Sequence, residues 1–172
     1  MKRIVVIGNA AAGKSNFSMR VNEITNIPVY HLDKILWKKD WERTSEEEFT
    51  FRHDEILKED SWIIDGVAYK STYPKRFSRA DTIIFLDTPL EECKERGLQR
   101  MKEDIERPNP YVTEGCRYPL EFIKEQNDVI ELFHNEYRKY ILEMIEQYKK
   151  EKTVILLKTN KDTQNFLETL KN

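Results

Sequence analysis

The sequence predicts an α/β fold, a three-layer sandwich in which a five-stranded parallel sheet lies between helices. Short apolar runs alternate along the chain with longer segments whose apolar residues recur at helical spacing. The first run, residues 4–7, contains no polar side chain, as expected of a strand buried on both faces. Parallel strands are joined through helices, so this alternation places helices on both faces of the sheet.

Local signals set the expected boundaries. The strands are expected at residues 4–7, 27–33, 62–66, 80–87 and 153–157. The helices are expected at residues 16–23, 44–58, 90–103, 120–149 and 162–170. Residues 44–48 read Thr-Ser-Glu-Glu-Glu, and a hydroxyl followed by acidic residues is typical of a helix start, while Pro89 suits a first helical turn. In residues 120–149, a three-and-four spacing of apolar residues indicates one long helix facing the core.

One segment interrupts this regular pattern. Residues 105–119 hold three prolines and one glycine and cannot form a regular helix. We expect a lid here, at about residues 104–119. Because the chain shows no repeat and no linker-like stretch, residues 1–172 are expected to form a single domain with this small lid.

Composition limits the classes of partner. The formal net charge is −2, so the chain lacks the strongly basic character of a dedicated nucleic-acid binder, and direct DNA binding is not favoured. Cys93 and Cys116 show no metal-ligand spacing. The first apolar run is too short for a signal peptide or a membrane span, so we expect a soluble cytoplasmic protein, monomeric or homodimeric.

Residues 8–15 spell G-x-x-x-x-G-K-S between the first strand and the first helix, which is the pattern of a phosphate-binding P-loop. Gly8 and Gly13 would allow the backbone to turn its N–H groups around a phosphate. Lys14 would reach the β- and γ-phosphates of ATP, and the Ser15 hydroxyl would bind Mg²⁺. The residues expected to hold ATP are Gly8, Asn9, Ala10, Ala11, Ala12, Gly13, Lys14, Ser15 and Asn16.

Acidic residues close several strands. Asp33, Asp65 and Asp87 each follow a separate apolar run. The carboxyl ends of parallel strands form the ligand-binding edge of such a sheet, so these residues should share that edge with the P-loop. Asp87 is better explained as a cap for the next helix than as a metal ligand.

A GTPase is disfavoured. Its guanine reader, N-K-x-D, would follow a late strand, and residues 160–163 place the acid one position early.

Four further motifs carry a family resemblance over nearly the whole chain. They are His31-Leu-Asp-x-x-x-Trp37, Trp62-Ile-Ile-Asp-Gly66, Arg76-x-x-x-Ala-Asp-Thr-Ile-Ile-Phe-Leu-Asp87 and Glu114-Gly-Cys116. Together they resemble the adenylate-kinase-related family of DNA topology modulation proteins. The resemblance implies a P-loop NTPase fold of the nucleoside-monophosphate-kinase-like branch, with strand order 2-3-1-4-5 and an ATP-binding phosphotransferase activity. Val67 stands where that family typically has asparagine, so a polar contact from this position is not carried over.

The resemblance and the needs of phosphoryl transfer suggest roles for the acidic residues. Asp65 is expected to help Ser15 hold Mg²⁺. Asp33 is expected to bind an acceptor hydroxyl and act as its base, with a cap or surface carboxylate as the alternative. Gly66 and Arg76 are assigned with Asp33 to the acceptor. His31 is better explained as a structural residue.

Arginines would neutralise the transferred phosphoryl group together with Lys14. Arg96 and Arg100 lie four residues apart on one helix face, and Arg107 and Arg117 lie in or beside the proline-bearing segment. Arg100 and Arg107 are assigned to catalysis, and the roles of the other two stay open. Residues 158–160 are expected near the adenine.

The expected activity is a Mg²⁺-dependent transfer of the ATP γ-phosphoryl group to a small acceptor. The lid arginines favour a nucleotide acceptor, whereas Asp33 favours a hydroxyl compound, and both stay open. A nucleotide-dependent regulator of DNA topology with little turnover is the alternative from another class. Hydrolysis of ATP without an acceptor is a third possibility.

Overall fold

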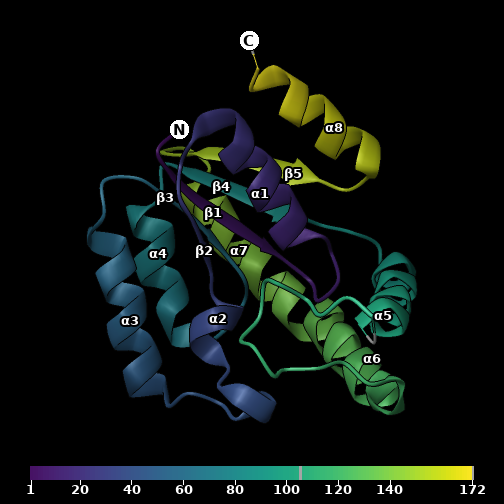
Figure 1. The fold of residues 1–172 in the computed structure, drawn as a ribbon. Coiled ribbons are helices and arrows are strands. Elements are labelled where there is room, and N and C mark those ends of the chain that lie inside the picture. The colour runs from purple at the N-terminus through teal and green to yellow at the C-terminus, as the bar shows by residue number, and fades with distance from the viewer. Residues whose placement is uncertain (105, 172) are drawn as a thin grey trace.

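The computed structural model describes residues 1–104 and 106–171, and Figure 1 shows its arrangement. Five strands form one all-parallel sheet in the order β2-β3-β1-β4-β5, which confirms the predicted fold class. The strands are β1 (Arg3–Gly8), β2 (Val29–His31), β3 (Trp62–Asp65), β4 (Thr82–Leu86) and β5 (Thr153–Leu157).

Helices cover both faces of the sheet. They are α1 (Lys14–Thr25), α2 (Asp33–Leu36), α3 (Glu46–Lys58), α4 (Tyr73–Arg79), α5 (Leu90–Asp104), α6 (Ile123–Leu132), α7 (Arg138–Tyr148) and α8 (Asn160–Thr169). Side chains of α1 and α8 pack in the apolar core on one face, and those of α3, α4 and α7 pack in the core on the other. Figure 1 shows how these helices are arranged about the sheet. No helix of the described residues is long and apolar enough to cross a membrane.

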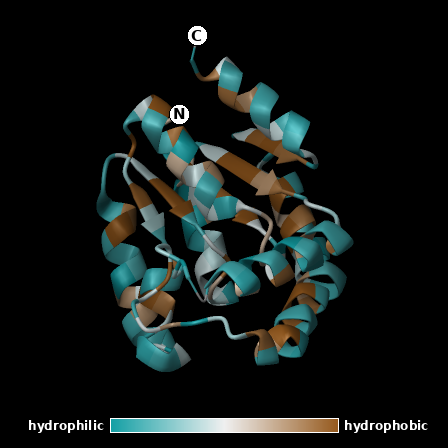
Figure 2. Cartoon of the chain, turned by 45° about the vertical axis from the view of Figure 1, so that its right-hand side comes forward, coloured by the Kyte–Doolittle hydropathy of each residue, from teal (hydrophilic) through white to brown (hydrophobic). Residues whose placement is uncertain are grey.

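The middle strand explains the two cores. Ile4 and Val6 of β1 belong to the core under α1 and α8, and Val5 and Ile7 belong to the core under α3, α4 and α7. None of the four has any exposed surface. Alternate side chains of a strand point to opposite faces, so an unbroken apolar run serves a sheet covered on both sides. Figure 2 shows the hydrophobic colour concentrated on the strands.

Several predicted boundaries move. The second strand ends at His31, and Asp33 begins the short helix α2. Helix α3 begins at Glu46, and its cap is Ser45, whose Oγ accepts the Glu48 N–H at 3.2 Å. Helix α8 begins at Asn160, because the side chain of Thr159 caps it two residues earlier than predicted.

The prediction of one continuous helix over residues 120–149 is wrong. A 3₁₀ turn (Leu120–Phe122) leads into α6, and a π-helical turn (Phe133–Tyr137) separates α6 from α7. Such a turn adds one residue and leaves the apolar spacing close to helical, so the sequence pattern does not reveal it.

Helix α4 was not predicted at all. The signal for it was Pro74 in its first turn, a position where proline costs no helical hydrogen bond. A 3₁₀ turn (Lys70–Thr72) precedes it, and another (Lys39–Trp41) follows α2.

Candidate functional site

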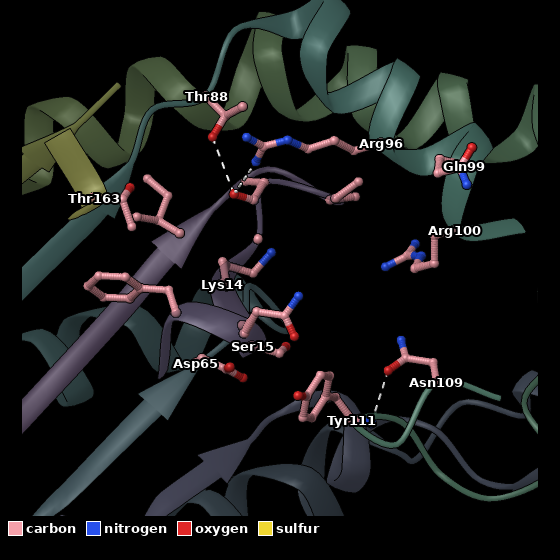
Figure 3. A pocket seen from close by; sticks show the side chains of 18 of the residues that line it. Lys14, Ser15, Asp65, Thr88, Arg96, Gln99, Arg100, Asn109, Tyr111 and Thr163 are labelled. Atoms are coloured by element: carbon pink, nitrogen blue, oxygen red, sulfur yellow. Dashed lines mark hydrogen bonds between the residues drawn. The ribbon is translucent and has the colours of Figure 1, made fainter. Parts of the chain in front are cut away.

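A cavity of about 720 Å³ opens at the carboxyl edge of the sheet. The P-loop, β3, α5, the β5–α8 connection and the segment predicted as a lid all contribute to its lining. Figure 3 shows Lys14 and Ser15 between Arg96 and Arg100 on one side and Asp65 and Tyr111 on the other. Among the candidate residues, those that line the cavity are Ala10, Ala11, Ala12, Gly13, Lys14, Ser15, Asn16, Asp33, Asp65, Gly66, Arg100 and Arg107.

The P-loop backbone has the torsions of a phosphate cradle. Gly13 has φ +92° and Ala11 has φ +57°, and both therefore lie in the left-handed region. The loop is braced from behind at the carbonyl of Ala12, which accepts Thr88 Oγ1 at 3.3 Å and Arg96 Nη1 at 3.1 Å (Figure 3). Helix α1 begins directly afterwards, so its N-terminal dipole faces the cavity.

Gly8 and Asn9 do not line the cavity. Gly8 is the last residue of β1, and a Cβ there would lie 2.6 Å from the Leu86 carbonyl oxygen of β4. Gly8 is thus required by close strand packing, and not by the positive φ expected of it. Asn9 is buried, and its amide donates to the Ile130 carbonyl at 2.9 Å while its Oδ1 accepts the Ala10 N–H at 2.7 Å. Its side chain therefore ties the P-loop to α6.

Lys14 and Asp33 share a desolvated environment. Lys14 Nζ donates to the Asn9 carbonyl at 2.7 Å. Burial lowers the pKa of Lys14, and the nearby carboxylates of Asp33 and Asp65 oppose that shift. Burial raises the pKa of Asp33, and Lys14 opposes it. A carboxylate whose proton affinity is raised in this way is better suited to accept a proton from a reacting hydroxyl.

Asp65 is held by a histidine. It closes β3 with a carboxylate that is 3% exposed, and His31 Nδ1 lies 3.0 Å from both of its oxygens. The His31 ring contacts Tyr111 of the lid, with 4.9 Å between centroids. Gly66, next in the chain, has φ +123°, and a Cβ there would lie 2.9 Å from Leu32 Cβ. His31 is therefore hydrogen-bonded to a carboxylate of the cavity.

Of the four arginines near the lid segment, three line the cavity and one does not. Arg96, Arg100 and Arg107 line the cavity. Arg96 Nη2 also donates to Asn160 Oδ1 at 2.8 Å, which links α5 to the expected adenine region, and residues 158–160 do line the cavity. Arg117 is paired with Asp104, with 3.2 Å between Nε and Oδ2.

Arg76, assigned to the acceptor from the sequence, lies outside the cavity lining. It has no exposed surface, and its Nη2 donates to the Val67 carbonyl at 2.9 Å. Its guanidinium carbon lies 4.5 Å from the centroid of the Tyr73 ring. Burial lowers its pKa to about 10. Asp87, expected as a cap, instead pairs with Arg138 through contacts of 2.6 and 2.8 Å.

The predicted lid segment, described from residue 106 to residue 119, is bonded at both ends to one buried carboxylate. Asp104 is 2% exposed and accepts the N–H groups of Asn109 at 3.2 Å and of Tyr118 at 2.8 Å. Farther along, Trp41 Nε1 donates to the Arg117 carbonyl at 2.6 Å. Residues 106–119 therefore cross the cavity and contact the segment that follows Asp33.

The lid also supplies cavity residues that the sequence analysis missed. Asn109, Tyr111 and Tyr118 all line the cavity. Their signal was a set of polar and aromatic side chains inside the proline-bearing segment. Four aromatic residues from neighbouring segments, Trp37, Trp41, Tyr69 and Tyr73, do not line the cavity and pack against other rings.

The donor set fits Mg²⁺ better than a metal that needs several protein ligands. Ser15 and Asp65 both line the cavity and offer oxygen atoms to an ion, and no group of three or more His, Cys, Asp or Glu among the described residues could hold one. Mg²⁺ beside a nucleotide uses one or two protein oxygens, with phosphates and water completing its shell. The cavity thus combines a phosphate cradle, cations for phosphate charge and a carboxylate of raised pKa.

Comparisons with known proteins give fold-level likeness. No protein-family model and no curated protein sequence matches the chain. A shikimate kinase from Acinetobacter baumannii in complex with shikimate matches with TM-score 0.56 at 16% identity, covering 99% of this chain and 90% of that one. The shikimate kinase from Aquifex aeolicus matches with TM-score 0.51 at 17% identity, covering 98% and 92%. These likenesses and the strand order show that the chain has the P-loop, nucleoside-monophosphate-kinase-like fold.

Proposed function

We propose that the chain is an ATP-dependent phosphotransferase that moves the γ-phosphoryl group of ATP to a small acceptor bearing a hydroxyl group. One observation carries this proposal: a single cavity is lined by the P-loop lysine Lys14, the carboxylates of Asp33 and Asp65 and the guanidinium of Arg100. Phosphoryl transfer depends mainly on positioning and charge neutralisation, and these residues supply both. A relation to the DNA topology modulation proteins rests on the four sequence motifs and forms part of the proposal.

We assign the residues of the cavity the roles that phosphoryl transfer requires. The P-loop amides and Lys14 bind the phosphates of ATP, and Arg100 and Arg107 neutralise the transferring group from the lid side. Asp33 accepts the proton of the acceptor hydroxyl while that oxygen bonds to the γ-phosphorus. The bond from phosphorus to the β–γ bridging oxygen breaks, and ADP leaves. Ser15 and Asp65 would hold Mg²⁺, which neutralises charge on the phosphate oxygens when bound.

The structure favours a hydroxyl acceptor over a nucleotide acceptor. A nucleotide acceptor brings its own phosphate and needs a cation on the acceptor side. Arg76, the candidate for that task, is fully buried outside the cavity, where it bonds the Val67 carbonyl. The acceptor side instead presents Asp33, which repels a phosphate and can accept a hydrogen bond from a hydroxyl group.

The test is a screen for thermal shift and turnover with Mg-ATP and three compound classes: nucleoside monophosphates, nucleosides and small hydroxy compounds. We expect turnover with a hydroxy compound. Lys14→Ala should abolish it while leaving the circular dichroism spectrum unchanged, and the exposed α3 variant Lys58→Ala is the matched control. Undiminished turnover in Lys14→Ala would refute the proposal.

The variant Asp33→Asn distinguishes ATP binding from phosphoryl transfer to the acceptor. It should keep ATP affinity and lose transfer by roughly the 10²- to 10⁴-fold expected for a general base. If transfer persists, Asp33 is not the base. Salt-dependent binding to duplex DNA without transfer to any acceptor would point instead to a DNA-acting regulator.

A further inference from the structure

Arg100 is held from two sides by residues that have no role in the proposal above. Its Nη2 donates to Gln126 Oε1 of α6 at 3.4 Å. Its guanidinium carbon lies 4.3 Å from the centroid of the Tyr118 ring, which the lid carries. In Figure 3 the Arg100 guanidinium points into the cavity, toward the side where Lys14 lies.

Gln126 occupies a space that a glycine leaves open. It is 9% exposed, does not line the cavity and faces α5. A Cβ at Gly97, three residues before Arg100, would lie 1.9 Å from Gln126 Nε2. Any other residue at position 97 would therefore displace this amide. Helix α5 thus carries a helix-weakening glycine at the one place where the amide of α6 must enter.

This arrangement has an energetic cost that apolar packing would avoid. Among the described residues, Gln126 Nε2 and Arg100 Nε have no hydrogen-bond partner, although both are buried. Unpaired buried polar atoms are destabilising, and a methionine could fill the same space without that cost. Packing therefore does not explain the amide at position 126, whereas the hydrogen bond that its oxygen accepts from Arg100 does.

Tyr118 makes the second contact depend on the lid. Its N–H is bonded to Asp104, and its ring lies 4.5 Å from that of Trp41 by centroids, in an edge-on arrangement. The Trp41 ring belongs to the segment that follows Asp33. When the lid lies across the cavity as observed, the face of Tyr118 covers the guanidinium, an arrangement favourable to a cation.

We infer that Gln126 is a positioning residue for Arg100, and that together with the ring of Tyr118 it aims the guanidinium at the γ-phosphate end of the cavity. This inference rests on the proposed function, because it assumes that ATP binds at the P-loop. Gln126 holds one guanidinium nitrogen from α6, and Tyr118 holds the plane of the group from the lid segment.

The test compares ATP with ADP, since only ATP carries the γ-phosphate. Calorimetry should show that Gln126→Met lowers affinity for ATP roughly tenfold and leaves that for ADP unchanged, the scale of one hydrogen bond to a charged group. In turnover, kcat should fall with little change in the KM for the acceptor. Gln126→Glu, which keeps an acceptor oxygen, should restore the preference for ATP. Gly97→Ala should reproduce the loss, and the exposed α6 variant Glu125→Ala should behave as the wild type.

A double-mutant cycle excludes a merely structural role. In an Arg100→Met background, Gln126→Met should have no further effect on the ratio of ATP to ADP affinity. Additive losses would overturn the inference, as would an unchanged ratio in Gln126→Met while Arg100→Met lowers it. In the lid, Tyr118→Leu should lower the ratio and Tyr118→Phe should keep it, because the ring face is retained.

The failure of the two proposals can be told apart. If the wild type binds neither nucleotide, the proposed function fails. If it binds both and Arg100→Met lowers the ratio while Gln126→Met does not, only the inference about Gln126 fails.

Discussion

Acid should destabilise the protein through His53, a histidine that no proposed chemistry uses. Its side chain on α3 has no exposed surface, and its Nε2 has no partner among the described residues. Burial lowers its pKa to about 4, assisted by the charges of Arg76 and Lys75 and opposed by a hydrogen bond to Asp54. The ring is packed parallel to Phe49, with centroids 6.0 Å apart.

The sign follows from which state takes the proton first. The unfolded chain protonates near the ordinary histidine pKa of 6.5, and the folded chain only near 4. Neutral His53 therefore contributes its full stability above pH 6.5, and that contribution is lost as the pH falls toward 4. One proton changes the free energy of unfolding by about 1.4 kcal/mol per pH unit, so about 2 kcal/mol is lost by pH 5 and about 3 kcal/mol by pH 4.

The assay is urea unfolding of the wild type and His53→Phe at pH 7.5, 6.0 and 5.0 and constant ionic strength. Phenylalanine keeps the ring packing and cannot titrate. The stability of the wild type relative to the variant should fall by about 2 kcal/mol between the highest and lowest pH. The partly exposed His134→Gln should retain the wild-type dependence. Parallel pH profiles of the wild type and His53→Phe would refute the reasoning.

Two further substitutions test the packing of the P-loop strand and the base of the lid. Gly8→Ala places a methyl group 2.6 Å from the Leu86 carbonyl, a backbone atom that cannot turn aside, and should lower stability by about 1–3 kcal/mol in calorimetric melting. An unchanged melting temperature would show that β1 and β4 can separate there. Asp104→Asn weakens the bonds to the Asn109 and Tyr118 N–H groups and should speed tryptic cleavage within the lid more than it lowers the urea midpoint. Equal cleavage rates in the two proteins would contradict this account of the lid.

The sheet was predictable because its information is local. An apolar run such as residues 4–7 is sufficient to indicate a buried strand, and alternation with helices indicates parallel pairing. The same rule brought Asp33 and Asp65 to the edge that the P-loop occupies, and both line the cavity there. Their catalytic and metal-binding roles stay predictions.

The rest could not be predicted because it depends on contacts between distant segments. Arg76 could be placed before β4 from the sequence, but nothing local shows that its guanidinium turns away from the cavity to the Val67 carbonyl. Gly97 has no local reason to interrupt a helix, since its reason is a side chain 29 positions later, on α6. The motif placed Asn9 in the phosphate cradle, yet its side-chain amide donates to the Ile130 carbonyl of α6.

The π-helical turn between α6 and α7 acts as a phase shift between two hydrophobic surfaces. Ile130 before the turn packs in the core shared with α1 and α8, whereas Ile141 after it packs in the opposite core. In an uninterrupted α-helix these two positions, eleven residues apart, would point in nearly the same direction. The extra residue rotates everything after it by about 100° and also brings Arg138 to Asp87. The continuous segment of α6, the π-helical turn and α7 thus contacts the P-loop through Asn9 at one end and covers the opposite face of the sheet at the other. Inserting or deleting even one residue in this segment would turn one of its two apolar surfaces away from its core.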